Sequence, residues 1–144
     1  MRASIEKIDV GFELPSLSHV IDVHGMNKGE FVDPENQKSN AIHFDEQFSK
    51  QQGFSSPVAT GMTSTFYANQ LLTDFFDEDW FNGGSLATKY ILPMYLGETI
   101  ICRARVIGKE KEQAGCRLDM ELWAEKSDGQ KNMVGSASVL VRMA

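Results

Sequence analysis

The sequence predicts an α+β fold in a single domain, with one long central helix followed by a run of antiparallel strands. Residues 62–76 contain no glycine or proline, and their apolar side chains recur near helical spacing. Residues 98–142 instead alternate apolar and polar side chains in segments separated by turn residues, which is typical of strands. A length of 144 residues and a hydrophobic fraction of 42% fit one globular domain with a buried core.

The central helix is predicted from its apolar stripe. Met62, Phe66, Leu72 and Phe76 lie near helical spacing, and neighbouring leucine and phenylalanine side chains widen the stripe. So many apolar positions predict a helix that is buried on most sides. A shorter helix is predicted at residues 45–52, because acidic residues open it and a glycine follows its end.

Strands account for most of the remaining periodic sequence. They are predicted at residues 17–24, 86–92, 98–107, 117–125 and 133–142, with Asp128-Gly129 as a hairpin turn before the last. Each long strand has one apolar face, and a single central helix covers such a face economically. The pattern therefore favours the hot-dog arrangement, in which an antiparallel sheet is wrapped around a central helix.

Charge and hydropathy exclude several classes of function. The net charge is −6 and the acidic residues are scattered, whereas a nucleic-acid surface needs clustered lysine and arginine. No apolar run approaches the roughly 20 residues that a membrane helix needs. Residues 1–10 carry charges and no apolar core, so they do not read as a signal peptide. We expect a cytoplasmic protein that binds neither nucleic acid nor membrane.

The sequence contains two cysteines, Cys102 and Cys116, and neither has another cysteine or a histidine at ligand spacing. Both fall in predicted strands, so we expect small buried side chains rather than a disulfide or a zinc site. The sequence also contains no phosphate-binding glycine loop, nucleophile elbow or metal motif. No metal is therefore expected.

Five stretches carry a further pattern. They read VGFELP at residues 10–15, NAIHFDE at 40–46, GFSSPVATGM at 53–62, KYILP at 89–93 and LGET at 96–99. In this order and spacing they resemble the MaoC-like dehydratase family, which includes the (R)-specific enoyl-CoA hydratases. The resemblance implies one hot-dog domain over residues 1–144 that acts on acyl thioesters.

The sequence departs from the family pattern at the position of the catalytic aspartate. Family hydratases carry an aspartate five residues before the motif histidine, and here that position is Lys38. Asp33 and Glu35 lie in the preceding loop and are candidates to replace it, although a solvated turn at Asp33-Pro34 is the simpler interpretation. Asp45 is nearer in sequence, but its position favours capping the following helix.

Hydration of a 2-enoyl thioester needs a base that removes a proton from water and an acid that protonates C2. It also needs hydrogen-bond donors that stabilise the enolate oxygen. His43 is the predicted acid–base residue, because imidazole titrates near neutral pH, and the family motif places Asn40 beside it to orient water or the thioester carbonyl. Gly61 is the expected oxyanion contact, since a glycine at a helix start lets a carbonyl approach backbone N–H groups. The structural alternatives are that His43 holds its loop together and that Gly61 only permits a turn.

Other residues near these are predicted to bind the substrate: Asn36, Thr60, Thr63 and Ser64. Asn36 lies in a long aperiodic loop at residues 28–40, and loops of that length are usually functional or mobile. The other three surround the predicted helix start. For Thr63 and Ser64 the alternative is a helix cap or a hydroxyl that faces the core.

The sequence thus predicts a hydro-lyase that adds water to, or removes it from, an acyl-CoA or acyl-carrier-protein thioester. One alternative is a hot-dog protein that binds the thioester without hydrating it, which Lys38 favours. Another is a related reaction such as thioester hydrolysis. The only cofactor expected is the CoA or carrier arm of the substrate itself. Long strands leave open sheet edges, so we expect a homodimer or a higher homo-oligomer.

Overall fold

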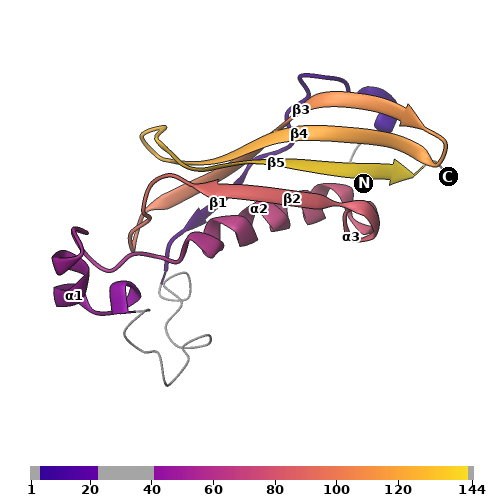
Figure 1. The fold of residues 1–144 in the computed structure, drawn as a ribbon. Coiled ribbons are helices and arrows are strands. Elements are labelled where there is room, and N and C mark those ends of the chain that lie inside the picture. The colour runs from indigo at the N-terminus through magenta and orange to yellow at the C-terminus, as the bar shows by residue number, and fades with distance from the viewer. Residues whose placement is uncertain (1–3, 23–40, 143–144) are drawn as a thin grey trace.

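The computed structural model describes residues 4–22 and 41–142, which form one five-stranded antiparallel sheet and a set of helices (Figure 1). The strands are β1 (Leu17–Val20), β2 (Ser85–Tyr90), β3 (Thr99–Glu112), β4 (Gly115–Lys126) and β5 (Lys131–Arg142). The helices are η1 (Ile5–Lys7) and η2 (Ala41–His43), both short 3₁₀ turns, and α1 (Glu46–Gln51), α2 (Gly61–Phe76) and α3 (Glu78–Gly83).

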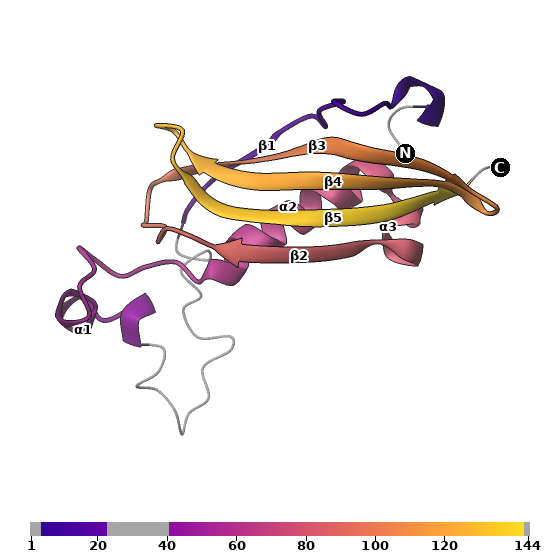
Figure 2. The same cartoon turned by 45° about the horizontal axis from the view of Figure 1, so that its top comes forward.

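The strands lie in the order β1-β3-β4-β5-β2, so the long strands β3, β4 and β5 form a central meander. The short strands β1 and β2 pair with β3 and β5 and form the two edges. The sheet curves around α2, which lies along one of its faces (Figures 1 and 2). The predicted α+β fold, a single antiparallel sheet wrapped around a central helix, is confirmed.

The core lies between α2 and the inner face of the sheet. The alternation in the sequence selects that face, and its buried side chains are Ile100, Cys102, Ala104 and Val106 from β3, and Leu118, Met120, Leu122 and Ala124 from β4. The helix contributes Ala68, Leu71, Leu72, Phe75 and Phe76. Burial of this apolar surface is the main force that holds the helix on the sheet.

The prediction that α2 is buried on most sides is wrong for the chain by itself. Leu72 and Phe76 are buried, whereas the side chains of Met62 and Phe66 are 56% and 57% exposed. The sheet covers only one side of the helix, and these two residues lie on the side that faces away from it. An apolar stripe in a sequence does not reveal which chain covers it.

Two elements differ from the sequence-based prediction near α3 and the β3–β4 hairpin. Asp77 has φ 56° and ψ −128°, a backbone conformation that favours glycine, and it separates α2 from α3. In α3, Trp80 is buried and its Nε1–H donates to Asn69 Oδ1 at 2.9 Å, which holds this short helix against α2.

The strands of the β3–β4 hairpin are longer than predicted. β3 continues past Ile107 to Glu112, and β4 begins at Gly115 rather than at Arg117.

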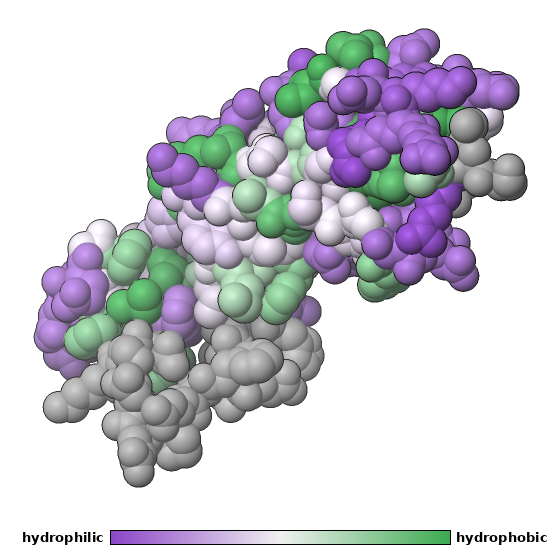
Figure 3. All heavy atoms as spheres, turned by 45° about the vertical axis from the view of Figure 1, so that its right-hand side comes forward, coloured by the Kyte–Doolittle hydropathy of each residue, from purple (hydrophilic) through white to green (hydrophobic). Residues whose placement is uncertain are grey.

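The extended part of the hairpin was missed because its side chains are polar on both faces. Lys109, Glu110, Lys111 and Glu112 give no alternation, and pairing with β4 alone keeps them extended. Figure 3 shows many hydrophilic residues (purple) at this end of the molecule, with hydrophobic residues (green) exposed among them and again near α1.

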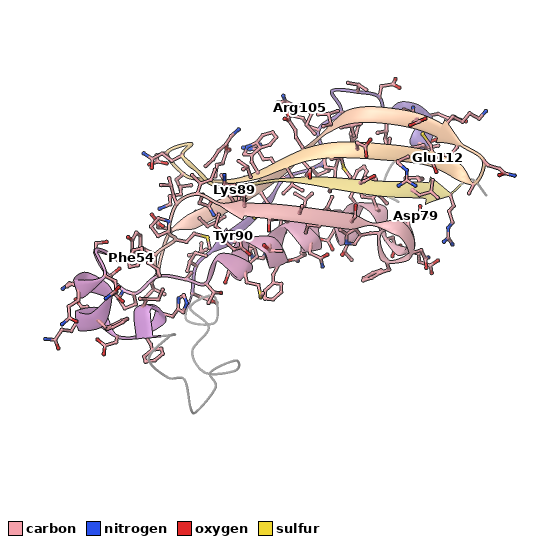
Figure 4. All side chains as sticks on the ribbon, in the orientation of Figure 1. Phe54, Asp79, Lys89, Tyr90, Arg105 and Glu112 are labelled. Carbon is pink, nitrogen blue, oxygen red and sulfur yellow. The ribbon has the colours of Figure 1, made fainter. Side chains whose placement is uncertain are left out.

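The outer face of β3 and β4 carries charges that neutralise one another. Arg103 Nε lies 2.7 Å from Glu125 Oε1, and this hydrogen bond lowers the pKa of Glu125. Arg105 contacts Glu13 and Glu121 and projects away from α2 (Figure 4). Both arginines are therefore solvated sheet-face charges with carboxylate partners.

Both cysteines are buried and free, as the sequence predicts. Burial raises the pKa of the Cys102 thiol to about 12, so the reactive thiolate is suppressed. Within the described ranges, no three histidine, cysteine or acidic side chains gather as a metal site. None of the helices in the described part of the chain is long and apolar enough to span a bilayer.

Candidate functional site

A pocket of about 380 Å³ lies where the start of α2 meets the turns before α1 and the end of β2. Its lining is Ile42, His43, Phe54, Val58, Ala59, Gly61, Tyr90, Ile91, Leu92, Pro93 and Met94. Phe54 and Tyr90 reach it from opposite sides, at the α1 end of the molecule (Figure 4). Most of the lining is aliphatic or aromatic, which suits an apolar ligand.

One side of the pocket is built on the turn between η2 and α1. Asp45 caps α1 as predicted, since its side chain accepts the N–H of Phe48 at 2.9 Å. Ser49 is fully buried, and its hydroxyl lies 2.9 Å from Ile42 O and 2.7 Å from Asp45 O. These contacts fold η2 back onto α1 and fix the position of His43.

The main-chain contact of His43 determines which of its ring nitrogens carries the proton. His43 Nδ1 lies 2.7 Å from the carbonyl oxygen of Val58. A carbonyl oxygen only accepts hydrogen bonds, so Nδ1 carries the proton in this contact. In the neutral ring the lone pair is then on Nε2, which is the arrangement that a general base requires.

The segment before α2 connects the two sides of the pocket. Val58 N–H donates to Ile42 O at 3.0 Å, and Ala59 N–H donates to Met94 O at 2.8 Å. Val58 also forms an isolated bridge with Tyr95. Residues 58–59 are therefore held by main-chain hydrogen bonds on both sides, and they deliver the chain into α2 at a fixed position.

Gly61 is the first residue of α2, a helix of 16 residues. The first N–H groups of an α-helix have no intrahelical acceptor, and they carry the positive end of the helix dipole. The preceding Thr60 does not cap them with its side chain, because its hydroxyl lies 3.0 Å from the hydroxyl of Thr63 instead. The first turn of α2 thus begins beside the pocket without a side-chain cap from Thr60, and its Thr63 N–H donates to Thr60 O at 3.0 Å.

Gly61 has no room for a side chain. A Cβ placed there would lie 2.5 Å from Cδ2 and 2.8 Å from Cγ of Tyr90, so the aromatic ring occupies the space that a side chain would need. This contact gives Gly61 a packing role in addition to the predicted oxyanion role.

A buried polar cluster lies beneath the pocket. Asn132, on β5, is 1% exposed and its Nδ2 donates to Ser64 Oγ at 2.8 Å. The Ser64 hydroxyl in turn donates to Met94 Sδ at 3.0 Å. The main-chain oxygen of Asn132 accepts from the N–H groups of Ile91 and Leu92 at 2.9 and 3.3 Å. The cluster therefore ties residues 91–94 to the first turn of α2.

We predict that Ser64→Ala destabilises the protein more than the loss of one exposed hydroxyl would. Asn132 Oδ1 has no hydrogen-bond partner among the described residues, and the substitution would leave Asn132 Nδ2 unpaired as well. A buried unpaired polar group costs about 1–3 kcal/mol, and this cost should appear as a lower free energy of unfolding in urea. The double variant Ser64→Ala/Asn132→Leu removes both partners and should recover most of the loss. A Ser64→Ala protein as stable as the wild type would contradict the role of the cluster.

The structure brings together only some of the predicted site residues. His43 and Gly61 line the same pocket. Thr60, Thr63 and Ser64 lie around the start of α2 but do not line the pocket, and Thr63 and Ser64 are buried. The remaining candidates, Asn36, Asn40, Lys38, Asp33 and Glu35, lie outside the described residues.

Sequence reasoning did not single out the apolar part of the pocket or Asn132. Residues 91–94 carry no titratable group, and only their place in the KYILP stretch marked them. Asn132 reaches the site because β2 pairs with β5, a contact between segments about forty residues apart that no local pattern reveals. Trp80 and Phe81, two aromatic residues of α3, do not line the pocket, whereas Tyr90 does.

A family model described as the MaoC like domain matches residues 38–134, more than half of the chain. No curated protein sequence gives a significant match. Among solved structures, the MaoC-like dehydratase from Rhodospirillum rubrum aligns with a TM-score of 0.77 at 17% identity, covering 97% of both chains.

Two further structures are similar at the same level. An unliganded R-hydratase from Pseudomonas aeruginosa has a TM-score of 0.73 and 16% identity, over 96% of this chain and 85% of its own. A (3R)-hydroxyacyl-ACP dehydratase complex from Mycobacterium tuberculosis has a TM-score of 0.67 and 14% identity, over 93% and 98%. These likenesses establish the hot-dog fold.

Proposed function

Because the chain belongs to the MaoC-like domain family, we propose that it hydrates 2-enoyl thioesters of CoA or acyl-carrier protein, or dehydrates the matching 3-hydroxyacyl thioesters. One observation carries this proposal: His43, with Nδ1–H bound to the carbonyl oxygen of Val58, and Gly61, the first residue of α2, line the same apolar pocket. We also propose that the whole chain, residues 1–144, forms a single hot-dog domain.

In the proposed reaction the thioester carbonyl lies against the N–H of Gly61 and the acyl chain lies in the apolar pocket. His43 Nε2 accepts a proton from water as the water oxygen bonds to C3 of the enoyl group. Negative charge then develops on the thioester oxygen, where the N–H groups of α2 stabilise it. The protonated ring returns its proton to C2, so one water is added and the imidazole is regenerated.

Asn40 is the residue that we propose to orient the water or the carbonyl, and Asn36 and Thr60 are proposed to contact the substrate. For Thr63 and Ser64 we favour an indirect role, since their hydroxyls are engaged at the helix start and in the polar cluster. We propose no cofactor besides the CoA or carrier arm of the substrate.

A second function is favoured by Lys38. The resemblance implies an aspartate at this position, whereas an ordinary lysine is positively charged at neutral pH and supplies no carboxylate to pair with His43. The alternative is a protein that binds the acyl thioester in the same pocket without hydrating it.

The test is turnover and binding of a panel of trans-2-enoyl-CoA thioesters and the corresponding acyl-carrier-protein thioesters. Water addition is followed by the loss of the enoyl absorbance, and binding is measured by calorimetry with the saturated analogues. Turnover supports the hydratase, and release of free thiol would instead indicate thioester hydrolysis. Tight binding without any turnover would replace the first proposal with the second.

We also propose that the protein is a homodimer that pairs along β2. Ile91 N–H bonds to Asn132 O, so the alternate residues Leu86, Thr88 and Tyr90 direct their main-chain groups away from β5. Thr65 of α2 contacts Thr88 and Tyr90 of this strand, and the exposed apolar residues Met62 and Phe66 lie next to Thr65 on the helix. An exposed edge next to apolar surface is a site for pairing with a second copy.

Phe66→Lys should convert the dimer into a monomer, because it places a charge in the proposed interface while leaving the core unchanged. Sedimentation velocity of the wild type and the variant at equal concentration measures this. Val20→Lys is the matched control, since Val20 is similarly exposed (58%) but lies on β1, at the opposite edge of the sheet from β2. A monomeric wild type, or a Phe66→Lys dimer as stable as the control, would contradict the proposal.

A further inference from the structure

We infer that Tyr90 is a specificity-determining residue that closes one end of the pocket and restricts its ligand to short acyl groups. The inference rests on the proposed function, because it concerns the acyl part of the same thioester.

Tyr90 is the last residue of β2 and lies across the start of α2. Its ring atoms Cδ2, Cε2 and Cγ would lie 2.5, 2.7 and 2.8 Å from a Cβ at Gly61, so the ring is in close contact with the glycine. The same ring lines the pocket that contains His43. Tyr90 therefore stands at the boundary between the pocket and the space along α2 and β2.

A chain of hydroxyl groups fixes the far end of the ring. Tyr90 OH lies 2.8 Å from Thr65 Oγ1, which also lies 2.8 Å from Thr88 Oγ1. Thr65 is one turn into α2 and Thr88 is two residues before Tyr90 on β2, so this chain joins the helix to the strand. Although Tyr90 is 48% exposed, its ring is held at both ends.

The residues of α2, β2 and β5 that lie nearest to the Tyr90 hydroxyl group are small. Thr65 is followed one turn later by the buried Ala68, and Thr88 is paired on β5 with Gly135, which has no side chain. Tyr90 is thus the bulky group that separates the pocket from a region of small residues. Removing the ring should lengthen the pocket along the helix.

The volume of the pocket agrees with a short ligand. About 380 Å³ is near the lower end of the range of roughly 300–1,000 Å³ that ligand pockets span. With the thioester carbonyl at Gly61, the ring of Tyr90 lies directly beside the reacting group. Among the described residues, Phe54 and residues 91–94 then bound the space that remains for the acyl chain.

The test is a chain-length profile, from four to twelve carbons, of both kcat/KM for trans-2-enoyl-CoA and Kd for the saturated acyl-CoA. For the wild type we expect a preference for the shortest chains. For Tyr90→Ala we expect the preference to move to longer chains, by about fourfold for each additional methylene that becomes buried. Tyr90→Phe keeps the ring and should keep the short-chain optimum. Phe81→Ala, which removes an exposed aromatic ring outside the pocket, should leave the profile unchanged.

The outcomes separate this inference from the proposed function. An active or ligand-binding wild type whose chain-length profile is the same in Tyr90→Ala would overturn the inference alone. A wild type that neither binds nor converts any thioester would overturn both. If Tyr90→Ala does not fold, the same chain-length profile is measured on Tyr90→Val, because valine is well suited to a strand. A shift toward long chains in either variant, absent in Phe81→Ala, supports the assignment.

Discussion

His43→Ala should lower the turnover of 2-enoyl thioesters by about 10²–10⁴-fold while leaving their binding nearly unchanged. General acid–base groups contribute rate factors of that order. The pocket is lined mainly by apolar side chains that remain in place, so the acyl group should still bind. Steady-state kinetics gives the loss in kcat, and calorimetry with a saturated analogue gives the dissociation constant.

A second substitution separates catalysis from the structural alternative. In His43→Asn the amide N–H can replace Nδ1–H as the donor to Val58 O, but no basic nitrogen remains. We expect this variant to unfold at the same urea concentration as the wild type and to be as inactive as His43→Ala. Full activity in His43→Asn would mean that His43 only holds its loop. His19→Ala is the matched control, because His19 contacts Gln70 and Tyr67 and does not line the pocket.

Gly61→Ala should lower kcat by about 10²–10³-fold, the cost of removing one oxyanion contact. The added methyl group would overlap the ring of Tyr90 at 2.5 Å, so the ring must move. We expect this displacement beside the pocket to disturb the proposed contact between the thioester oxygen and the first N–H groups of α2. The glycine is not in a positive-φ conformation, so alanine is compatible with the backbone and the effect is confined to the space around it.

The double variant Gly61→Ala/Tyr90→Ala assigns the effect to one of these two causes. Removing the ring gives the methyl group room, so any loss that came from displaced packing should be recovered. A loss in kcat that persists in the double variant, relative to Tyr90→Ala, measures the contact between the carbonyl and the helix start. Recovery of full activity would show that Gly61 serves only to accommodate Tyr90.

The fold was predictable because one face of each long strand is buried. The alternation of Ile100, Cys102, Ala104 and Val106 specifies the inner face of β3, and a one-residue slip would expose the whole set. Residues 109–112 at the end of β3 lack such a buried face, so they gave no signal. The exposure of Met62 and Phe66 was unpredictable for a different reason, since burial depends on what covers the helix.

The site was predictable only where a residue type carries chemistry. His43 and Gly61 were identified because imidazole and a helix-start glycine have few equally good substitutes. Tyr90, by contrast, looks like an ordinary strand residue until its ring is seen against Gly61. Asn132 is separated from Ser64 by 68 residues in sequence, and only the pairing of β2 with β5 brings them together.

The way Asn132 holds residues 91–92 affects how this protein can change over evolution. The path of that segment depends on main-chain hydrogen bonds to the carbonyl oxygen of Asn132, and any non-proline residue at these positions can make them. The side chains of Ile91 and Leu92 are 50% and 37% exposed and line the pocket, so few core contacts depend on them. We expect substitutions there to alter the preference for the proposed acyl ligand at little cost in stability. The two positions are therefore where natural variants, or a directed library, can explore new substrates without first acquiring compensating mutations.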